Sequence, residues 1–242
     1  SAADVTVPSS AGAVTVSNPT ASSLDVSWVA SADVDGGGYV VVRYETDPGT
    51  GNDPNQNGIY AVGNSVATGG TVRYIGTGTS FTDNLGLTEG TQYWYKVYAV
   101  DKAFNYADET TGNGTTSVLP IATSTFSPSD NATDIALKPS LVITFNKNIA
   151  KGTGSIVVKR VSDDNLMETI DVTSASVAIS GAVATITLSN TLGFNTDYYV
   201  NIDAGAIKDI LNNSFAGIND KTTWNFTTRA AYTDATVTSG TY

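Results

Sequence analysis

The sequence predicts an all-β protein built from two tandem β-sandwich modules. Three observations support this fold class. The chain has 242 residues, which suits two sandwiches of about 100 to 150 residues each. Thr, Ser, Val, Gly and Asn are abundant, whereas the strong helix formers are scarce. Short runs that alternate apolar and polar residues are separated by turn-forming clusters.

The composition also excludes several kinds of chemistry. The chain contains no Cys and no His. A thiol nucleophile, a disulfide framework, a Ser-His-Asp triad and a zinc site of the HExxH kind are therefore excluded within this chain. A hydrolase with paired carboxylates is the least favoured of the functions that we weighed, because nearly all acidic residues fall in predicted turns. We expect no enzyme here.

The charge of the chain bears on its partners. The formal net charge is -11 and the pI is near 4.2, with no cluster of Lys and Arg. Such a chain repels phosphate backbones, so we expect no nucleic-acid partner. No apolar run reaches the roughly 18 residues of a membrane span, so we expect no membrane span either.

The first module is expected over residues 1–120, and its strands are marked by alternation. The alternating sets are Leu24, Val26 and Trp28; Val40, Val42 and Tyr44; and Tyr93, Tyr95, Val97 and Ala99. Each set predicts a strand with one face toward a core. The second set follows the glycines at 36–38, which predict a turn.

Two features of this module are similar to a fibronectin type III domain. Trp28 lies in the second predicted strand, and Leu87-Thr88-Glu89-Gly90-Thr91-Gln92-Tyr93 precedes the long strand. The resemblance covers about residues 10–118 and implies that Trp28 lies in the core. It also implies that the Tyr93 hydroxyl bonds to nearby backbone at a tyrosine corner. The segment 45–72 is longer than this family usually has, and its Gly, Pro and Asn predict a loop.

A short pattern inside that loop resembles the start of a calcium site. Asp53, Asn55, Asn57 and Gly58 follow the D-x-[DN]-x-[DN]-G order, which places oxygen ligands around a sharp turn. The twelfth position is Asn64 instead of a bidentate Glu, and no helices are expected beside the loop. Calcium at Asp53, Asn55 and Asn57 is therefore one hypothesis, and a plain polar turn is the favoured one.

The outward face of the two long strands is the candidate ligand-binding surface. If Val40, Val42 and Tyr44 point inward, the residues between them point outward. The same argument places Trp94, Lys96 and Tyr98 outward. An exposed surface of Tyr39, Arg43, Trp94 and Tyr98 would suit a glycan or a surface protein. The favoured alternative is cross-strand pairing that only stabilises the sheet.

The second module is expected over residues 121–230, after a short linker near 119–123. Its strands resemble the bacterial Ig-like domain of the SbsA type. The resemblance is carried by Pro128 to Ala132, Ile143-Thr144-Phe145, Tyr198 with Ile202, the loop Asp209 to Asn213, and Trp224-x-Phe226-Thr227. It implies no catalytic residues. Asp209, Asn212 and Asn213 are expected to close their loop by side-chain to backbone bonds. Residues 231–242 are expected to form a tail or to begin a further segment.

Together these patterns predict two immunoglobulin-like β-sandwiches without catalytic machinery. We expect a structural spacer within a larger secreted or surface-anchored bacterial protein, located outside the cell. The alternative is an adhesion module that binds carbohydrate or protein. The expected partners are other domains of the same polypeptide, with a glycan or surface protein in the alternative. No cofactor is expected, calcium at the polar loop being the one candidate.

Overall fold

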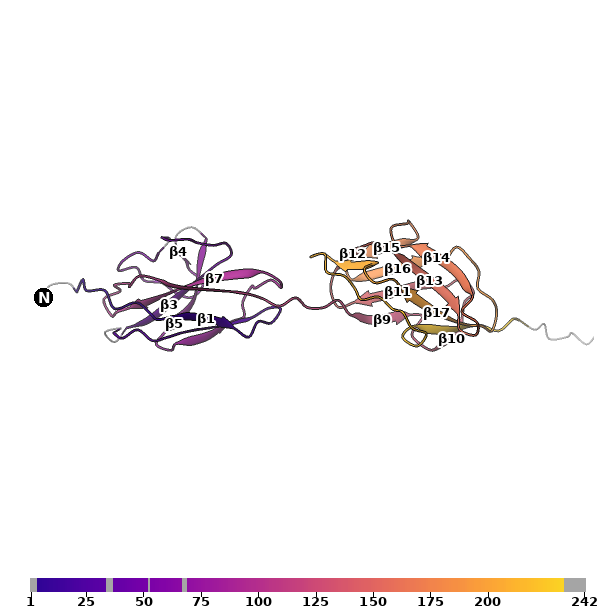
Figure 1. Ribbon diagram of the computed structural model, residues 1–242, viewed down its shortest axis with the longest axis horizontal. Coiled ribbons are helices and arrows are strands. Elements are labelled where there is room, and N and C mark those ends of the chain that lie inside the picture. Colours follow the sequence, from indigo (N-terminus) through magenta and orange to yellow (C-terminus); the bar gives the residue numbers. More distant parts are fainter. Residues whose placement is uncertain (1–3, 34–36, 52, 67–68, 233–242) are drawn as a thin grey trace, which may run out of the picture. The chain divides into compact units, whose positions relative to one another are not determined.

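The computed structural model describes residues 4–33, 37–51, 53–66 and 69–232, and all regular structure in these ranges is β (Figure 1). The chain divides into two compact units, Ser1–Leu119 and Pro120–Tyr242. The glycine at 36 and most of the expected tail, residues 233–242, lie outside the described residues. The prediction of an all-β fold with tandem sandwiches is confirmed.

The first unit is a sandwich of two antiparallel sheets. The smaller sheet has the order β1 (Val14–Ser17), β2 (Leu24–Trp28), β6 (Ser80–Asp83). The larger sheet has the order β4 (Ser65–Val66), β5 (Gly70–Gly76), β3 (Gly38–Tyr44), β7 (Gln92–Val100), β8 (Thr110–Thr115).

The core between these sheets is built around Trp28. Its ring meets the rings of Tyr39, Tyr74 and Phe81 edge to face, at centroid distances of 5.4, 5.5 and 6.4 Å. Aromatic pairs favour this geometry because the positive ring edge meets the negative ring face. The predicted core position of Trp28 is confirmed, since its side chain is buried in this cluster.

The predicted facing of β3 is wrong. In β3, Tyr39 and Val41 belong to the core between the sheets, together with Val97 of β7. Directly paired residues share a face, and Val41 pairs with Val97. Val40 and Val42 point to the opposite side. Apolar residues occupy consecutive positions in β3, so alternation alone could not tell its two faces apart.

The outer face of the larger sheet carries a second hydrophobic cluster. Its buried members are Val40, Val42, Tyr44, Val66, Val72, Tyr98, Val100 and Tyr106. A segment that we call the cap, residues 45–51 and 53–64, lies against this face. Tyr60 of the cap packs on the cluster, and its ring meets that of Tyr106 at 6.1 Å. The first unit therefore buries both faces of its larger sheet.

The second unit contains three sheets. A five-stranded sheet has the order β10 (Ala132–Ile135), β19 (Asn225–Thr228), β17 (Asp197–Ile202), β13 (Ser155–Arg160), β14 (Leu166–Asp171). A four-stranded sheet has the order β15 (Val177–Ser180), β16 (Val183–Thr187), β11 (Ser140–Phe145), β9 (Thr123–Ser127). β12 (Ile149–Lys151) and β18 (Ile207–Asp209) form a short pair.

One hydrophobic cluster fills this unit. Leu141 and Ile143 of β11 alternate inward toward Ile156 of β13, and all three are fully buried. Trp224 is also fully buried, and its indole N–H donates to the carbonyl of Pro128 at 2.8 Å. The bond satisfies the only polar atom of the indole, which would otherwise be costly to bury.

Both units contain a tyrosine corner with the same spacing. The Tyr93 hydroxyl accepts from the backbone N–H of Thr88 at 2.8 Å, so the predicted corner is confirmed. In the second unit the Tyr198 hydroxyl accepts from Gly193 N–H, also at 2.8 Å. The donor precedes the tyrosine by five residues in each case. The sequence analysis singled out Tyr198 without assigning it this role.

Candidate functional site

The predicted ligand-binding surface of Tyr39, Arg43, Trp94 and Tyr98 does not form. Tyr39 and Arg43 point into the sandwich, whereas Trp94 and Tyr98 lie on the opposite face of the sheet. Tyr39 is 3% exposed and Tyr98 is 1% exposed. The expectation failed because β3 was assigned the wrong face and because the cap covers most of the outer surface.

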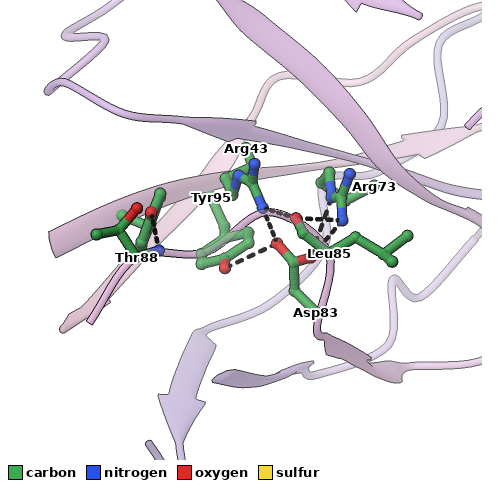
Figure 2. A network of polar contacts seen from close by, with 7 residues as sticks. Arg43, Arg73, Asp83, Leu85, Thr88 and Tyr95 are labelled. Carbon is green, nitrogen blue, oxygen red and sulfur yellow. Dashed lines mark hydrogen bonds and ion pairs between the residues drawn. The ribbon is translucent and has the colours of Figure 1, made fainter. Parts of the chain in front are cut away.

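Arg43 instead belongs to a buried ionic cluster, which we call the clasp (Figure 2). Asp83 accepts from Arg43 at 3.0 Å and from Arg73 at 2.7 Å. The Tyr95 hydroxyl donates to the same carboxylate at 3.1 Å. Both guanidinium groups also donate to the carbonyl of Leu85, at 2.8 and 2.9 Å. The Asp83 side chain is fully buried, so its charge is compensated entirely by these donors.

The clasp joins the two sheets of the first unit. Asp83 ends β6 in the smaller sheet, whereas Arg43, Arg73 and Tyr95 come from β3, β5 and β7 of the larger one. A register shift at Val41/Val42 makes Arg73 the extra residue of a β-bulge. Bulges re-aim side chains, and this one allows Arg73 to reach Asp83 although the next residue also packs into the core.

The sequence analysis did not find the clasp. Arg43 was treated as an exposed cation, and Asp83 was not singled out. Burial raises the pKa of Tyr95, and the neighbouring Asp83 carboxylate raises it further, so the phenol remains a donor at neutral pH. The sequence offered only an Asp beside a strand and two Arg residues in a chain that has few cations. Such residues do not show by themselves which of them form ion pairs.

Lys96 fixes the cap on the outer face. Its ammonium group is fully buried and lies 3.5 Å from Asp53 and 3.3 Å from Glu109. It also donates to the carbonyl of Gly51, and it lies over the Tyr44 ring. A buried ammonium needs such compensation because desolvation of a charge is costly. The cap is therefore held by a charge that comes from the sheet.

Tyr98 adds a second polar link between sheet and cap. Its hydroxyl donates to Asp53 Oδ1 at 2.7 Å. Burial and this hydrogen bond raise the pKa of Tyr98, so that it stays protonated. Burial likewise raises the pKa of the neighbouring Tyr44 to about 12. These contacts make Tyr98 a fixing point for the cap and leave its ring covered.

The calcium hypothesis named Asp53, Asn55 and Asn57, and these three residues make separate contacts. Asp53 bonds to Tyr98 and faces Lys96. The Asn57 amide donates to the carbonyl of Ala103 at 2.9 Å. The backbone N–H of Asn55 donates to the Tyr60 hydroxyl. Within the described residues no group of three or more Asp, Glu, His or Cys is placed to hold a metal ion.

An open groove lies beside Trp94, the member of the predicted surface that is only partly buried. The groove has a volume of about 450 Å³ and lies between residues 47–50 of the cap and strand β8. Trp94 contributes an aromatic ring, and Asp47, Glu109 and Asn113 contribute polar groups. Volumes of this size are typical of sites for small ligands.

In the second unit the predicted role of the Asp209 loop is confirmed. The Asp209 carboxylate accepts from the backbone N–H of Leu211 at 2.9 Å and from that of Asn213 at 2.8 Å. Burial acts to raise its pKa, but the bonds from Asn213 and the Lys147 ammonium outweigh burial and hold the pKa below its usual value. The cluster closes a turn.

Residues 117–228 match the family model described as a bacterial Ig-like domain, which covers most of the second unit. This match confirms the predicted resemblance at the level of the family, and the SbsA type stays a prediction. No curated protein sequence matches the chain. Among the residues that the structure describes, no helix could span a membrane.

Solved structures similar to the chain include two segments from chicken. A two fibronectin type III domain segment of tenascin is 18% identical, with a TM-score of 0.42, over 86% of this chain and 96% of that one. The FN1–FN3 domains of CNTN1 are 11% identical, with a TM-score of 0.33, over 93% of this chain and 68% of that one.

Proposed function

We propose that this chain is a non-catalytic spacer within a larger secreted or surface-anchored bacterial protein. Ig-like domains are typically extracellular modules of larger proteins that bind or support structure, and the second unit matches a bacterial family of such domains. Its partners in this role are the other domains of the same polypeptide.

The observation that carries the proposal is that the aromatic outer face of the larger sheet is covered by the chain itself. The larger sheet of the first unit could have offered Tyr44, Tyr98 and Tyr106 to a partner, but the cap of the same chain covers them. In the second unit most of the described aromatic residues pack in one core, namely Phe145, Tyr198, Phe215, Trp224 and Phe226. Two closed sandwiches in sequence separate the segments attached to them along the chain.

Two features support the absence of catalysis in this role. The chain has neither Cys nor His to act as a nucleophile or a base near neutral pH. Its most buried carboxylate, Asp83, is fully engaged by two guanidinium groups and a phenol. That carboxylate is therefore enclosed by its hydrogen-bond and ion-pair partners, which suits a structural role.

The test replaces the segment in its parent protein. Residues 4–232 are exchanged for an unrelated tandem pair of Ig-like sandwiches of equal length, and the deletion of the segment serves as the matched control. A spacer predicts that the exchanged protein keeps the surface display and the activity of its neighbouring domains, whereas the deletion impairs them. Loss of those activities in the exchanged protein would contradict the proposal.

A further inference from the structure

We propose that the groove beside Trp94 binds a neutral glycan. The groove lies on the first unit, between the cap at Asp47 and strand β8 at Thr111 and Asn113, with Glu109 just before that strand. This role goes beyond spacing, because it gives the chain a ligand of its own. It also differs from the surface that the sequence suggested, since only Trp94 is shared.

The strand register brings the groove residues to one side of the sheet. Trp94 of β7 pairs with Asn113 of β8, and Lys96 pairs with Thr111. Paired residues share a face, and every second residue along a strand returns to it. Trp94, Thr111 and Asn113 therefore all point to the outer face, where the cap forms the opposite wall at Asp47.

The chemistry of the groove fits a sugar ring. A pyranose has faces of C–H groups, which pack on an aromatic ring, and a rim of hydroxyl groups, which need hydrogen-bond partners. Trp94 supplies the ring, with its indole partly exposed in the groove. Hydrogen-bond acceptors around the ring come from Asp47, Glu109 and Asn113. A hydrogen bond from a hydroxyl to an ionised carboxylate is stronger than one between two neutral groups.

Charge selects the class of glycan. Asp47 and Glu109 are acidic, and no Lys or Arg lines the groove among the described residues. The Lys96 ammonium, which contacts Glu109 of the groove, is fully buried between Asp53 and Glu109. An acidic polysaccharide would face the two carboxylates, and no cation lining the groove would pair with the charges of the polysaccharide. Its binding is therefore disfavoured. A neutral polymer meets no such penalty.

The walls of the groove are fixed before a ligand arrives. Lys96 and Tyr98 tie the cap to the sheet through Asp53. The Asp47 carboxylate accepts from the backbone N–H of Gly49 at 2.9 Å, which orients that wall. The Gln92 amide donates to Asn113 at 3.0 Å, which orients the other. A preformed site loses little entropy on binding.

The test is affinity electrophoresis of the whole chain through gels that contain one soluble polysaccharide each. The neutral probes are a β-glucan, a xylan and a mannan, and the acidic probe is alginate. At least one neutral polymer is expected to retard the protein, and alginate is expected not to. Absence of retardation by all three neutral polymers, or retardation by alginate alone, would overturn the proposal.

Variants connect the retardation to this groove. Trp94→Ala is expected to weaken the association about thirtyfold, because a Trp anchor in an interface is typically worth about 2 kcal/mol or more. Asn113→Ala, which leaves the ring in place, is expected to weaken it about fivefold through one lost hydrogen bond. Phe194→Ala, in the second unit, removes an exposed ring elsewhere and should leave binding unchanged.

Two results of the variants would overturn the assignment. The first is unchanged retardation of both Trp94→Ala and Asn113→Ala, which would place the binding elsewhere. The second is an equal loss in Phe194→Ala, which would show non-specific adhesion of exposed rings. Hydrogen exchange across β7 and β8 establishes that each variant keeps the fold, and Asn113→Ala carries the test if Trp94→Ala does not fold.

Discussion

Each of the two units has a tyrosine corner of the same kind, and the units differ in what lies outside their sandwiches. In both, a tyrosine hydroxyl accepts from a backbone N–H, and a threonine on the last strand or just after it closes the same turn. Thr116 donates to the Thr88 carbonyl at 2.6 Å, and Thr228 donates to the Gly193 carbonyl at 2.6 Å. A common corner therefore does not dictate a common surface.

The difference lies in what each unit adds outside its sandwich. The first unit has two hydrophobic clusters, one on each face of its larger sheet, and an ionic clasp between its sheets. The second unit has one cluster and no such clasp within its described residues. The cap covers a sheet face that would otherwise contact solvent. The groove lies at the margin of the cap.

The largest expected effect concerns the clasp. Asp83→Asn removes the charge that Arg43 and Arg73 share, so it should destabilise the first unit by about 3 to 5 kcal/mol and leave the second unaffected. Urea-dependent hydrogen exchange by mass spectrometry reads the two units separately. Asp108→Asn, at an exposed carboxylate of the same unit, should change stability by less than about 0.5 kcal/mol. An equal loss in both units would contradict the assignment of the clasp to one of them.

The next effect concerns the cap. Lys96→Met should loosen the cap and cost about 2 kcal/mol, because Asp53 and the Gly51 carbonyl lose their charged partner. Limited proteolysis should then cut within residues 45–64 while the sandwich core stays protected. Lys102→Met changes an exposed ammonium of the same unit and should leave the cutting rate unaltered. An unchanged cap in Lys96→Met would mean that apolar packing alone holds it.

The tyrosine corners should respond alike. Tyr93→Phe and Tyr198→Phe each remove one acceptor from a backbone N–H and should each cost about 1 kcal/mol, in the first and the second unit respectively. The measurement is again exchange resolved by unit. Tyr232→Phe, at a ring that is 95% exposed, is the neutral control. A markedly larger cost in one unit would show that the two corners are equivalent in geometry only.

The smallest expected effect concerns the backbone conformation at the tyrosine corners. Gly90 has a φ of 63° and Asn195 a φ of 45°, and each lies three residues before the corner tyrosine. Asn195→Gly should change stability by only a few tenths of a kcal/mol, since both residues accept this conformation. Gly90→Ala should cost about 1 kcal/mol, and the new Cβ would lie 3.1 Å from Val118. Thermal unfolding with exchange by unit measures both. If Gly90→Ala left the stability of the first unit unchanged, the positive φ at this position would not require glycine.

The sequence predicted the fold class, the core role of Trp28 and the corner at Tyr93 because each rests on a local pattern. It failed on the facing of β3, where Val40, Val41 and Val42 give both faces the same apolar character. The clasp was also beyond its reach. Asp83 is far from Arg43 in the chain, and the bulge that aims Arg73 depends on pairing.

The groove was predicted only through one of its residues. Trp94 was named as a surface ring. The positions of Glu109 and Asn113 beside it depend on the register of β8 against β7. Asp47 reaches the site because Lys96, a residue expected to point into solvent, is buried and holds the cap. Long-range pairing determined these positions, and no local pattern encodes it.

The clasp also affects how the first unit recovers from being pulled apart. In a chain without cysteine, Asp83 and its two arginines join the two sheets by ion pairs. Ion pairs re-form without an oxidant and cannot be exchanged for a wrong covalent partner, as disulfides can. Repeated stretching and refolding of this unit therefore leaves no covalent error to repair, and reductants in the surroundings do not weaken it.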